Sequence, residues 1–273
     1  MAPPASDGSG SAARFRRTQG GLAASLRRDM RRLRRLIVPS RLQASVPDWI
    51  EAVRALLGEY GAASVALAAD FYDAQRVEAG VPGRFAVPVP DPPPDEQVEA
   101  SLRWATKDVW PRDPEAATTT DAQLEPLDVR LDQAEKKAEG VAERLMLNQG
   151  RQTIREAVQR DRYAVAYARA AALGACSFCA LMSSRGAVYK DLDAVGRAAD
   201  EKFTGADSVI KFHNSCRCQP IPVFRGQRFE LSPKAQEWDR LYRDYAAGHP
   251  GDQLRLFRKA LADHNARTLP GAF

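Results

Sequence analysis

The residues best suited to chemistry are four cysteines and one histidine in the C-terminal third of the sequence. They follow the pattern Cys176-x2-Cys179 and then, after 33 residues, His213-x2-Cys216-x-Cys218. A C-x2-C turn aims two thiolates at one ion about 2.3 Å away, and side chains at i and i+2 of an extended strand share one face. All 4 cysteines of the chain fall in this window, so the pattern predicts a single metal site.

A structural zinc ion takes four ligands, whereas this cluster offers five candidates. The favoured set is Cys176, Cys179, His213 and one of Cys216 and Cys218, with the remaining cysteine donating to a thiolate. An all-cysteine site that leaves His213 outside is the other arrangement, and the spacing does not choose between them.

The neighbours of the histidine exclude two classes of catalytic zinc site. His213 is followed by Asn214 and Ser215, so the chain has neither the H-x-E motif of zinc deaminases nor the H-E-x-x-H motif of zinc proteases. The prediction is therefore a structural zinc site that holds the C-terminal third of the chain together.

Other catalytic groups are scarce. The only histidines are His213, His249 and His264, and Ser183 and Ser184 lie outside any G-x-S-x-G motif. A serine protease needs Ser, His and an acid brought together, so no catalytic residue is predicted from the sequence.

Arginine is concentrated near the N-terminus. Residues 14–41 include ten arginines and a single acidic residue, Asp29. Such a segment can neutralise several phosphates or contact an acidic partner, although no recognition motif surrounds it. The candidate contact residues are Arg27, Arg28, Arg31, Arg32, Arg34 and Arg35.

The elements that position these residues are predicted to be mainly helical. Leu22, Leu26, Met30, Leu33 and Ile37 form a helical stripe, and a heptad-like seam begins at residue 127. Gly61 and Gly150 are expected to interrupt their helices. We expect another helix to reach about residue 172, and short strands at 187–189, 209–212 and 221–224. The fold class is a helical body with a small α+β, zinc-pinned module near the C-terminus.

Composition divides the chain into six predicted segments. Residues 1–20 are poor in large apolar side chains, which predicts disorder, and residues 81–94 hold six prolines. The segments are a disordered to helical basic arm (1–41), a helical segment (42–80), a proline-rich connector with a short helix (81–126), long helices (127–173), the zinc module (174–230) and C-terminal helices (231–273).

Hydropathy predicts no contact with the bilayer interior. No apolar run approaches the roughly 20 residues that a membrane span needs, and the first residues lack the apolar core of a secretory signal. We therefore expect a cytoplasmic origin.

Two stretches of the cysteine-rich region resemble a known family. C-S-F-C-A-L-M-S-S-R-G-A-V-Y, at Cys176–Tyr189, and F-H-N-S-C-R-C-Q-P-I-P-V-F, at Phe212–Phe224, look like the signature of MuF-like phage minor head proteins, also called head morphogenesis proteins. In that family a C-x2-C is followed, after a variable loop, by H-x2-C-R-C and a proline. The resemblance is specific over Cys176–Phe224, and residues 1–125 carry no such motif.

The resemblance implies a minor capsid protein of a tailed phage. Its expected partners are the portal protein and the scaffold or major capsid protein, with possible non-specific DNA contact. Its expected place is the procapsid and virion interior, and the host cytoplasm during assembly. Similar proteins of actinobacterial phages are often labelled capsid maturation proteases, so proteolysis is one alternative. A DNA-binding internal head protein is the other.

Overall fold

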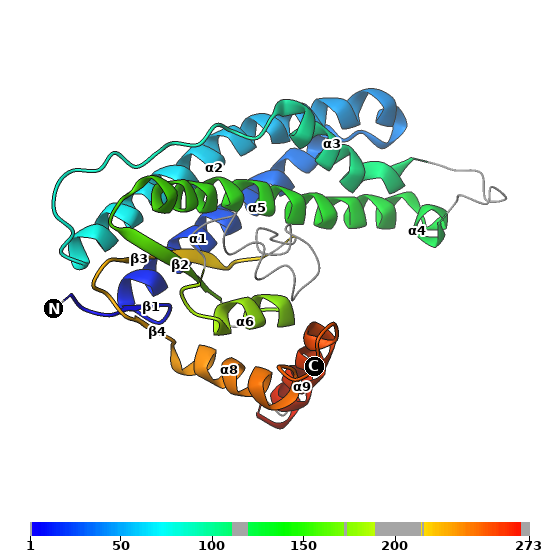
Figure 1. Ribbon diagram of the computed structural model, residues 1–273. Helices are drawn as coiled ribbons and strands as arrows, with labels where there is room; N and C mark the ends of the chain where they lie inside the picture. Colours follow the sequence, from blue (N-terminus) through cyan, green and yellow to red (C-terminus); the bar gives the residue numbers. More distant parts are fainter. Residues whose placement is uncertain (1, 111–119, 172–173, 189–213, 215, 269–273) are drawn as a thin grey trace.

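The computed structural model describes residues 2–110, 120–171, 174–188, 214 and 216–268. Most of them are helical (Figure 1), which confirms the predicted fold class: mainly α, with a small α+β part towards the C-terminus. In chain order the elements are β1 (Ala5–Ser6), α1 (Gly10–Leu33), α2 (Leu42–Glu78), α3 (Asp95–Thr106), α4 (Asp121–Leu124), α5 (Leu127–Arg160), β2 (Ala164–Ala170), α6 (Ser177–Ser184), β3 (Gln219–Phe224), β4 (Phe229–Glu230), α8 (Pro233–Tyr245) and α9 (Gln253–Thr268).

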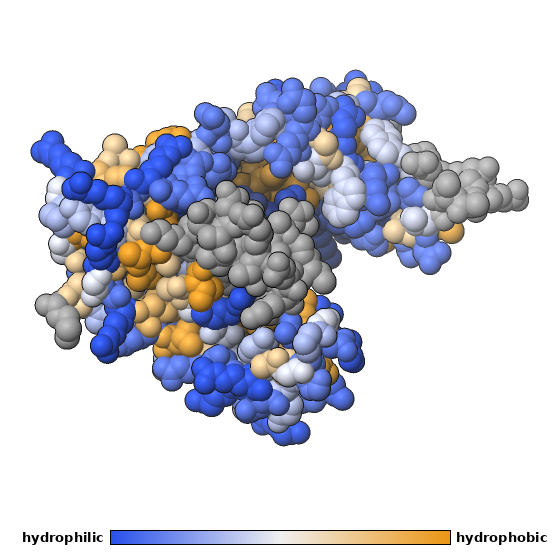
Figure 2. Space-filling model, in the orientation of Figure 1, coloured by the Kyte–Doolittle hydropathy of each residue, from blue (hydrophilic) through white to orange (hydrophobic). Residues whose placement is uncertain are grey.

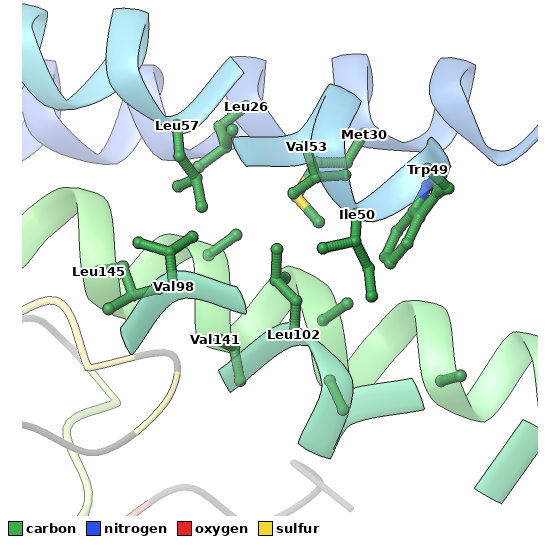
Figure 3. Packing of buried hydrophobic residues seen from close by; sticks show 14 of the residues in the cluster. Leu26, Met30, Trp49, Ile50, Val53, Leu57, Val98, Leu102, Val141 and Leu145 are labelled. Atoms are coloured by element: carbon green, nitrogen blue, oxygen red, sulfur yellow. The ribbon is translucent and has the colours of Figure 1, made fainter. Parts of the chain in front are cut away.

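The body of the molecule is formed by α1, α2, α3 and α5. Their apolar faces meet in one buried cluster, to which each of the four helices contributes (Figure 3). Leu26 and Met30, which the sequence places on one helical stripe, are among its buried members. The stripes that the sequence predicts therefore face the same core. The labelled members are Leu26, Met30, Trp49, Ile50, Val53, Leu57, Val98, Leu102, Val141 and Leu145.

Two glycines that were expected to interrupt helices lie inside continuous ones. Gly61 is in α2 and Gly150 is in α5. A Cβ atom at Gly150 would lie 2.6 Å from the Ser64 hydroxyl oxygen, and one at Gly61 would lie 2.2 Å from the Gln149 amide nitrogen. The expectation was wrong because the absence of a side chain lets α2 and α5 approach closely, and the packing offsets the low helix propensity of glycine.

The N-terminal residues are not disordered as expected. Helix α1 begins at Gly10, and the Ser9 hydroxyl caps it by accepting a hydrogen bond from the Ala12 amide at 3.2 Å. The Phe15 ring stacks on Phe71 with the ring centres 4.3 Å apart. Composition misled here because small buried residues such as Ala12 pack helices closely while adding little to the apolar count.

A strand replaces the helix that was expected to reach residue 172. Strand β2 pairs with β3 in antiparallel register, with Ala168 opposite Ile221. Helix α5 ends where Asp161 takes an extended conformation, and the Asp161 carboxylate pairs with Arg76 of α2. The predicted strand at 221–224 is confirmed within β3. Residues 187–188 are not a strand, and the expected strand at 209–212 lies outside the described residues.

The C-terminal helices pack on α6 rather than on the helical body. Met182 of α6, Trp238 of α8 and Phe257 of α9 belong to one buried cluster, and the α8–α9 hairpin lies beneath α6 in Figure 1. Figure 2 shows hydrophilic side chains over the outer faces of the body and of the hairpin, with hydrophobic side chains gathered between them. None of the described helices is long and apolar enough to cross a membrane.

The predicted division at residues 41, 80, 126, 173 and 230 stays a prediction. Short segments from the two ends of the chain nevertheless meet. Strand β1 pairs in parallel with β4, and the Asp7 carboxylate accepts hydrogen bonds from the amide and hydroxyl of Ser232, at 2.6 and 2.7 Å. The N-terminus is thereby attached to the start of α8.

The close crossing of α2 and α5 gives a stability prediction. Gly150→Ala is expected to lower the free energy of unfolding by about 1–3 kcal/mol, because its new methyl group would overlap Ser64. Exposed Gly58 in α2 has open space at its Cβ position, so Gly58→Ala is the matched control and should stabilise by about 0.5–1 kcal/mol. Urea denaturation measures both. Equal effects of the two substitutions would contradict the close approach.

Candidate metal centre

The described cysteines converge at the junction of α6 and β3. Cys176 and Cys179 lie at the start of α6, and Cys216 and Cys218 precede β3. The sulfur atoms of Cys179 and Cys216 are 3.4 Å apart, and those of Cys179, Cys216 and Cys218 all lie within 4.8 Å of one another. These three residues are each 2% exposed. The two halves of the sequence pattern therefore meet in one buried cluster.

Cys176 lies at the exposed edge of this cluster. Its sulfur caps α6 by accepting a hydrogen bond from the Cys179 amide at 3.4 Å. A hydrogen bond with the Cys176 side chain is also the largest of the effects that raise the pKa of the Cys179 thiol. Amide donors at a helix N-terminus favour a thiolate, which is the form of cysteine that binds metals.

Of the five predicted ligands, the structure describes the four cysteines, and His213 lies outside the described residues. The sequence left open which of Cys216 and Cys218 is the fourth ligand, and the structure does not separate the two. Both side chains are buried in the cluster with Cys179, so neither stands apart from the candidate site.

The chemistry of the cluster suits a metal ion. Four ligands placed tetrahedrally about 2.3 Å from zinc are about 3.8 Å from one another, close to the spacing seen here. Hydrogen bonds from Cys179 and Cys218, together with the charge of Arg151, lower the pKa of the Cys216 thiol, whereas hydrogen bonds within the cluster and burial raise the pKa values of Cys179 and Cys218. Soft thiolates select zinc and similar ions over hard cations. Three buried cysteines this close together can bind a metal.

Helix α5 holds the C-R-C segment in place. Nε of Arg151 donates to the Cys218 carbonyl at 2.9 Å, and its Nη2 donates to the Cys216 carbonyl. Glu143, about two turns earlier in α5, accepts a hydrogen bond from Nε of Arg217 at 3.0 Å. The backbone on both sides of Arg217 and the Arg217 side chain itself are thus attached to one helix.

Sequence reasoning missed Glu143 and Arg151. A signal for Arg151 was present, because it continues the helical stripe formed by Leu147, Ile154 and Val158, all of them buried. A charged residue inside an apolar stripe indicates a buried polar partner. The partners themselves are 65 and 67 residues away, which no local pattern reveals.

The predicted contact arginines fall into two groups. On α1, Arg27 pairs with Glu143, and Arg31 makes two hydrogen bonds to Glu139, at 2.7 and 3.2 Å. These two pairs tie α1 to the antiparallel α5. The others, Arg28, Arg32, Arg34 and Arg35, lie near the C-terminal end of α1, and Arg28 and Arg32 pair with Asp29 of the same helix. Contact with an outside partner stays a prediction for the set.

The residues weighed for proteolysis have main-chain or local partners. The hydroxyl of Ser183 donates to the Arg169 carbonyl at 2.7 Å, and that of Ser184 donates to the Leu181 carbonyl at 2.8 Å. His264 of α9 lies 2.6 Å from a carboxylate oxygen of Glu237 in α8.

Residues 8–247 match the VG15 protein family. The chain belongs to the VG15 family. This is a phage-associated family, which indicates a phage-encoded protein. The match extends from α1 through the cysteine cluster to the end of α8, while α9 lies beyond it. Neither a curated protein nor a solved structure matches the chain.

The cysteine cluster predicts the metal content of the purified protein. Full-length protein prepared without chelators should contain about one equivalent of zinc, and Cys216→Ser should lose most of it. Ser177→Ala lies in the C-x2-C turn but removes only a hydroxyl that contacts Arg258, so it should keep the metal. Elemental analysis measures all three. Less than about half an equivalent in fresh wild-type protein would contradict the site.

The ion pairs of Glu143 predict a second stability effect. This carboxylate is 2% exposed and pairs with both Arg27 and Arg217. Glu143→Gln should lower the free energy of unfolding by about 1–3 kcal/mol, because the charge-assisted hydrogen bonds to Arg27 of α1 and to Arg217 of the C-R-C segment are lost. Glu156→Gln affects a pair with the exposed Arg160 and a hydrogen bond from Gln152 of the same helix, and it should cost less than about 1 kcal/mol. Calorimetric thermal unfolding compares the two variants. Equal losses of stability would contradict a structural role for the ion pairs of Glu143.

Proposed function

We propose that this phage-encoded protein is a MuF-like minor capsid protein of a tailed phage, which associates with the portal and acts in procapsid assembly or in DNA packaging and delivery. In this role it works in the host cytoplasm during assembly and resides inside the procapsid and virion. Its metal is a structural zinc ion.

The observation that carries the proposal is the meeting of the two signature halves. The MuF-like resemblance rests on a C-x2-C stretch and a C-R-C stretch, and their cysteines form one buried cluster. In a chance likeness, two short stretches would have no reason to converge. Membership of a phage-associated family supports the same conclusion independently.

A structural role for the zinc agrees with the position of the cluster. It lies between α6, which carries the α8–α9 hairpin, and the C-R-C segment, which is attached to α5. When bound, the ion supplies crosslinks between these two parts of the chain. Cys179, Cys216 and Cys218 are buried, so they offer thiolates in a place that water reaches poorly.

The exposed end of α1 is the proposed contact with an acidic face of the portal, scaffold or major capsid protein. The side chains of Arg28 and Arg32 are 63% and 69% exposed, and Arg35 is exposed as well. Their only acidic neighbour within α1 is Asp29. A protein partner is favoured over DNA because the cluster occupies one helix end rather than a long groove.

Association with the portal is the direct test. Co-expressed with the portal protein of its own phage, the wild-type chain should be captured by tagged portal, and procapsids should contain a few copies by mass spectrometry. Replacing Arg28, Arg32 and Arg35 with serine should weaken capture at least tenfold. Exposed Arg103 and Arg160 lie on other helices, and their serine variants are the matched control.

Two outcomes would change the proposal. Absence of the protein from procapsids and virions, with normal heads when its gene is deleted, would overturn it. If the triple variant keeps portal binding but loses retention on DNA in low salt, the arginine cluster binds nucleic acid instead. Specific cleavage of the scaffold or capsid protein, abolished by one point substitution, would establish the maturation protease.

A further inference from the structure

Two fully buried arginines lie beside the cysteine cluster. Arg151 of α5 and Arg169 of β2 are each 1% exposed. Arg151 reaches the cluster through its hydrogen bonds to the carbonyls of Cys216 and Cys218. Arg169 pairs in the β2–β3 register with Pro220, two residues beyond Cys218. The two guanidinium groups thus come to the cluster from different elements.

The side chain of Arg169 also reaches the C-x2-C turn. Its guanidinium carbon lies 5.9 Å from the centre of the Phe178 ring, which precedes Cys179 in α6. Ala171 and Ala175 pack against the same cluster of three buried cysteines. In this buried, apolar setting the positive charges of Arg151 and Arg169 are little screened by water.

Burying two positive charges is costly unless negative charge is close by. Arg151 donates to the carbonyls of Cys216 and Cys218, and the Arg169 guanidinium lies beside Phe178, which packs against the buried cysteines. A divalent ion held by four thiolates carries two net negative charges, which equals the charge of two guanidinium groups. Three thiolates and a neutral imidazole would leave only one negative charge.

We propose that Arg151 and Arg169 are the counter-charges of a divalent metal ion held by the thiolates of Cys176, Cys179, Cys216 and Cys218. This inference rests on the metal site of the proposed function and adds its ligand set and its charge balance. The arginines act through the cysteines as positioning and charge-balancing residues. Since Arg151 also holds the C-R-C backbone, metal binding and the seating of this segment on α5 depend on the same side chain.

The first measurement is zinc affinity, obtained by competition with a chromophoric chelator on the full chain. Arg169→Met should weaken zinc binding about 10- to 100-fold, the usual effect of losing a group that supports metal ligands. Arg169→Lys keeps the charge and should stay within about threefold of wild type. If Arg169 served only in packing, Arg169→Met and Arg169→Lys would weaken zinc binding to a similar extent.

A double-substitution cycle tests charge balance directly. Cys176→His exchanges one thiolate for a neutral ligand at the exposed edge of the site, so the site then has one positive charge in excess. Adding Arg169→Met to Cys176→His should therefore cost less than about threefold, against the much larger loss in the wild-type background. Independent structural effects would give equal losses in both backgrounds.

Cobalt substitution tests the ligand set. In the Co²⁺ protein, Cys176→Ala should weaken the sulfur-to-metal charge-transfer absorption, whereas His213→Ala should leave the spectrum unchanged. The reverse result would overturn the four-cysteine set.

The remaining outcomes are decisive as well. Wild-type zinc affinity in Arg169→Met, an equal loss in Arg169→Lys, or equal losses in both cycle backgrounds would overturn the counter-charge role while leaving the metal site intact. A wild-type protein that binds no zinc would instead remove the site on which the inference rests. If circular dichroism shows that Arg169→Met does not fold, the same cycle with Arg151→Gln gives the answer.

Discussion

The attachment of the C-R-C segment to α5 joins the helical body to the cysteine cluster. Arg151 binds the carbonyls of Cys216 and Cys218, and Glu143 binds Arg217 between them. The same helix packs against α1, α2 and α3 in the body. Together with the bond from Ser183 to β2 and the bonds from Ser232 to Asp7, this segment fixes the cysteine cluster, α6 and the C-terminal hairpin relative to the core.

The N-terminal arginines fall into two groups: some hold helices together, and others are exposed. Near the N-terminus the arginines look in sequence like a free basic arm, yet Arg27 and Arg31 are bound to carboxylates of α5. Glu143 links two distant parts of the chain, because it pairs with Arg27 of α1 and with Arg217 of the C-R-C segment. The arginines that remain exposed at the end of α1 are the ones suited to contact a partner.

The family match and the cysteine cluster support each other without being redundant. The VG15 match covers residues 8–247 and identifies a phage-associated chain, but it says nothing of metal. The cluster accounts for why short cysteine stretches far apart in sequence occur together. Helix α9 follows the matched residues in sequence. It packs with α8 on α6, so it belongs to the same C-terminal part of the molecule.

The sequence by itself determined what depends on near neighbours. Helical stripes and the C-x2-C turn follow from spacings of a few residues and are present where the sequence places them, whereas Cys216 and Cys218 precede β3 rather than lie in it. The fold class and the candidate metal residues could be predicted for this reason. Local spacing also failed at particular positions: Gly150 lies inside a continuous helix, and residues 164–170 form a strand.

Only the tertiary structure decided which distant side chains meet. That Arg151 and Glu143 face the cysteine segment, and that Gly150 fits against Ser64, depends on how whole helices pack, because each contact joins residues more than 60 positions apart. Packing can reverse a weak local preference of about 1 kcal/mol, as it does at the two glycines. The cysteine spacing predicted a metal site, and the fold supplied the charges around it.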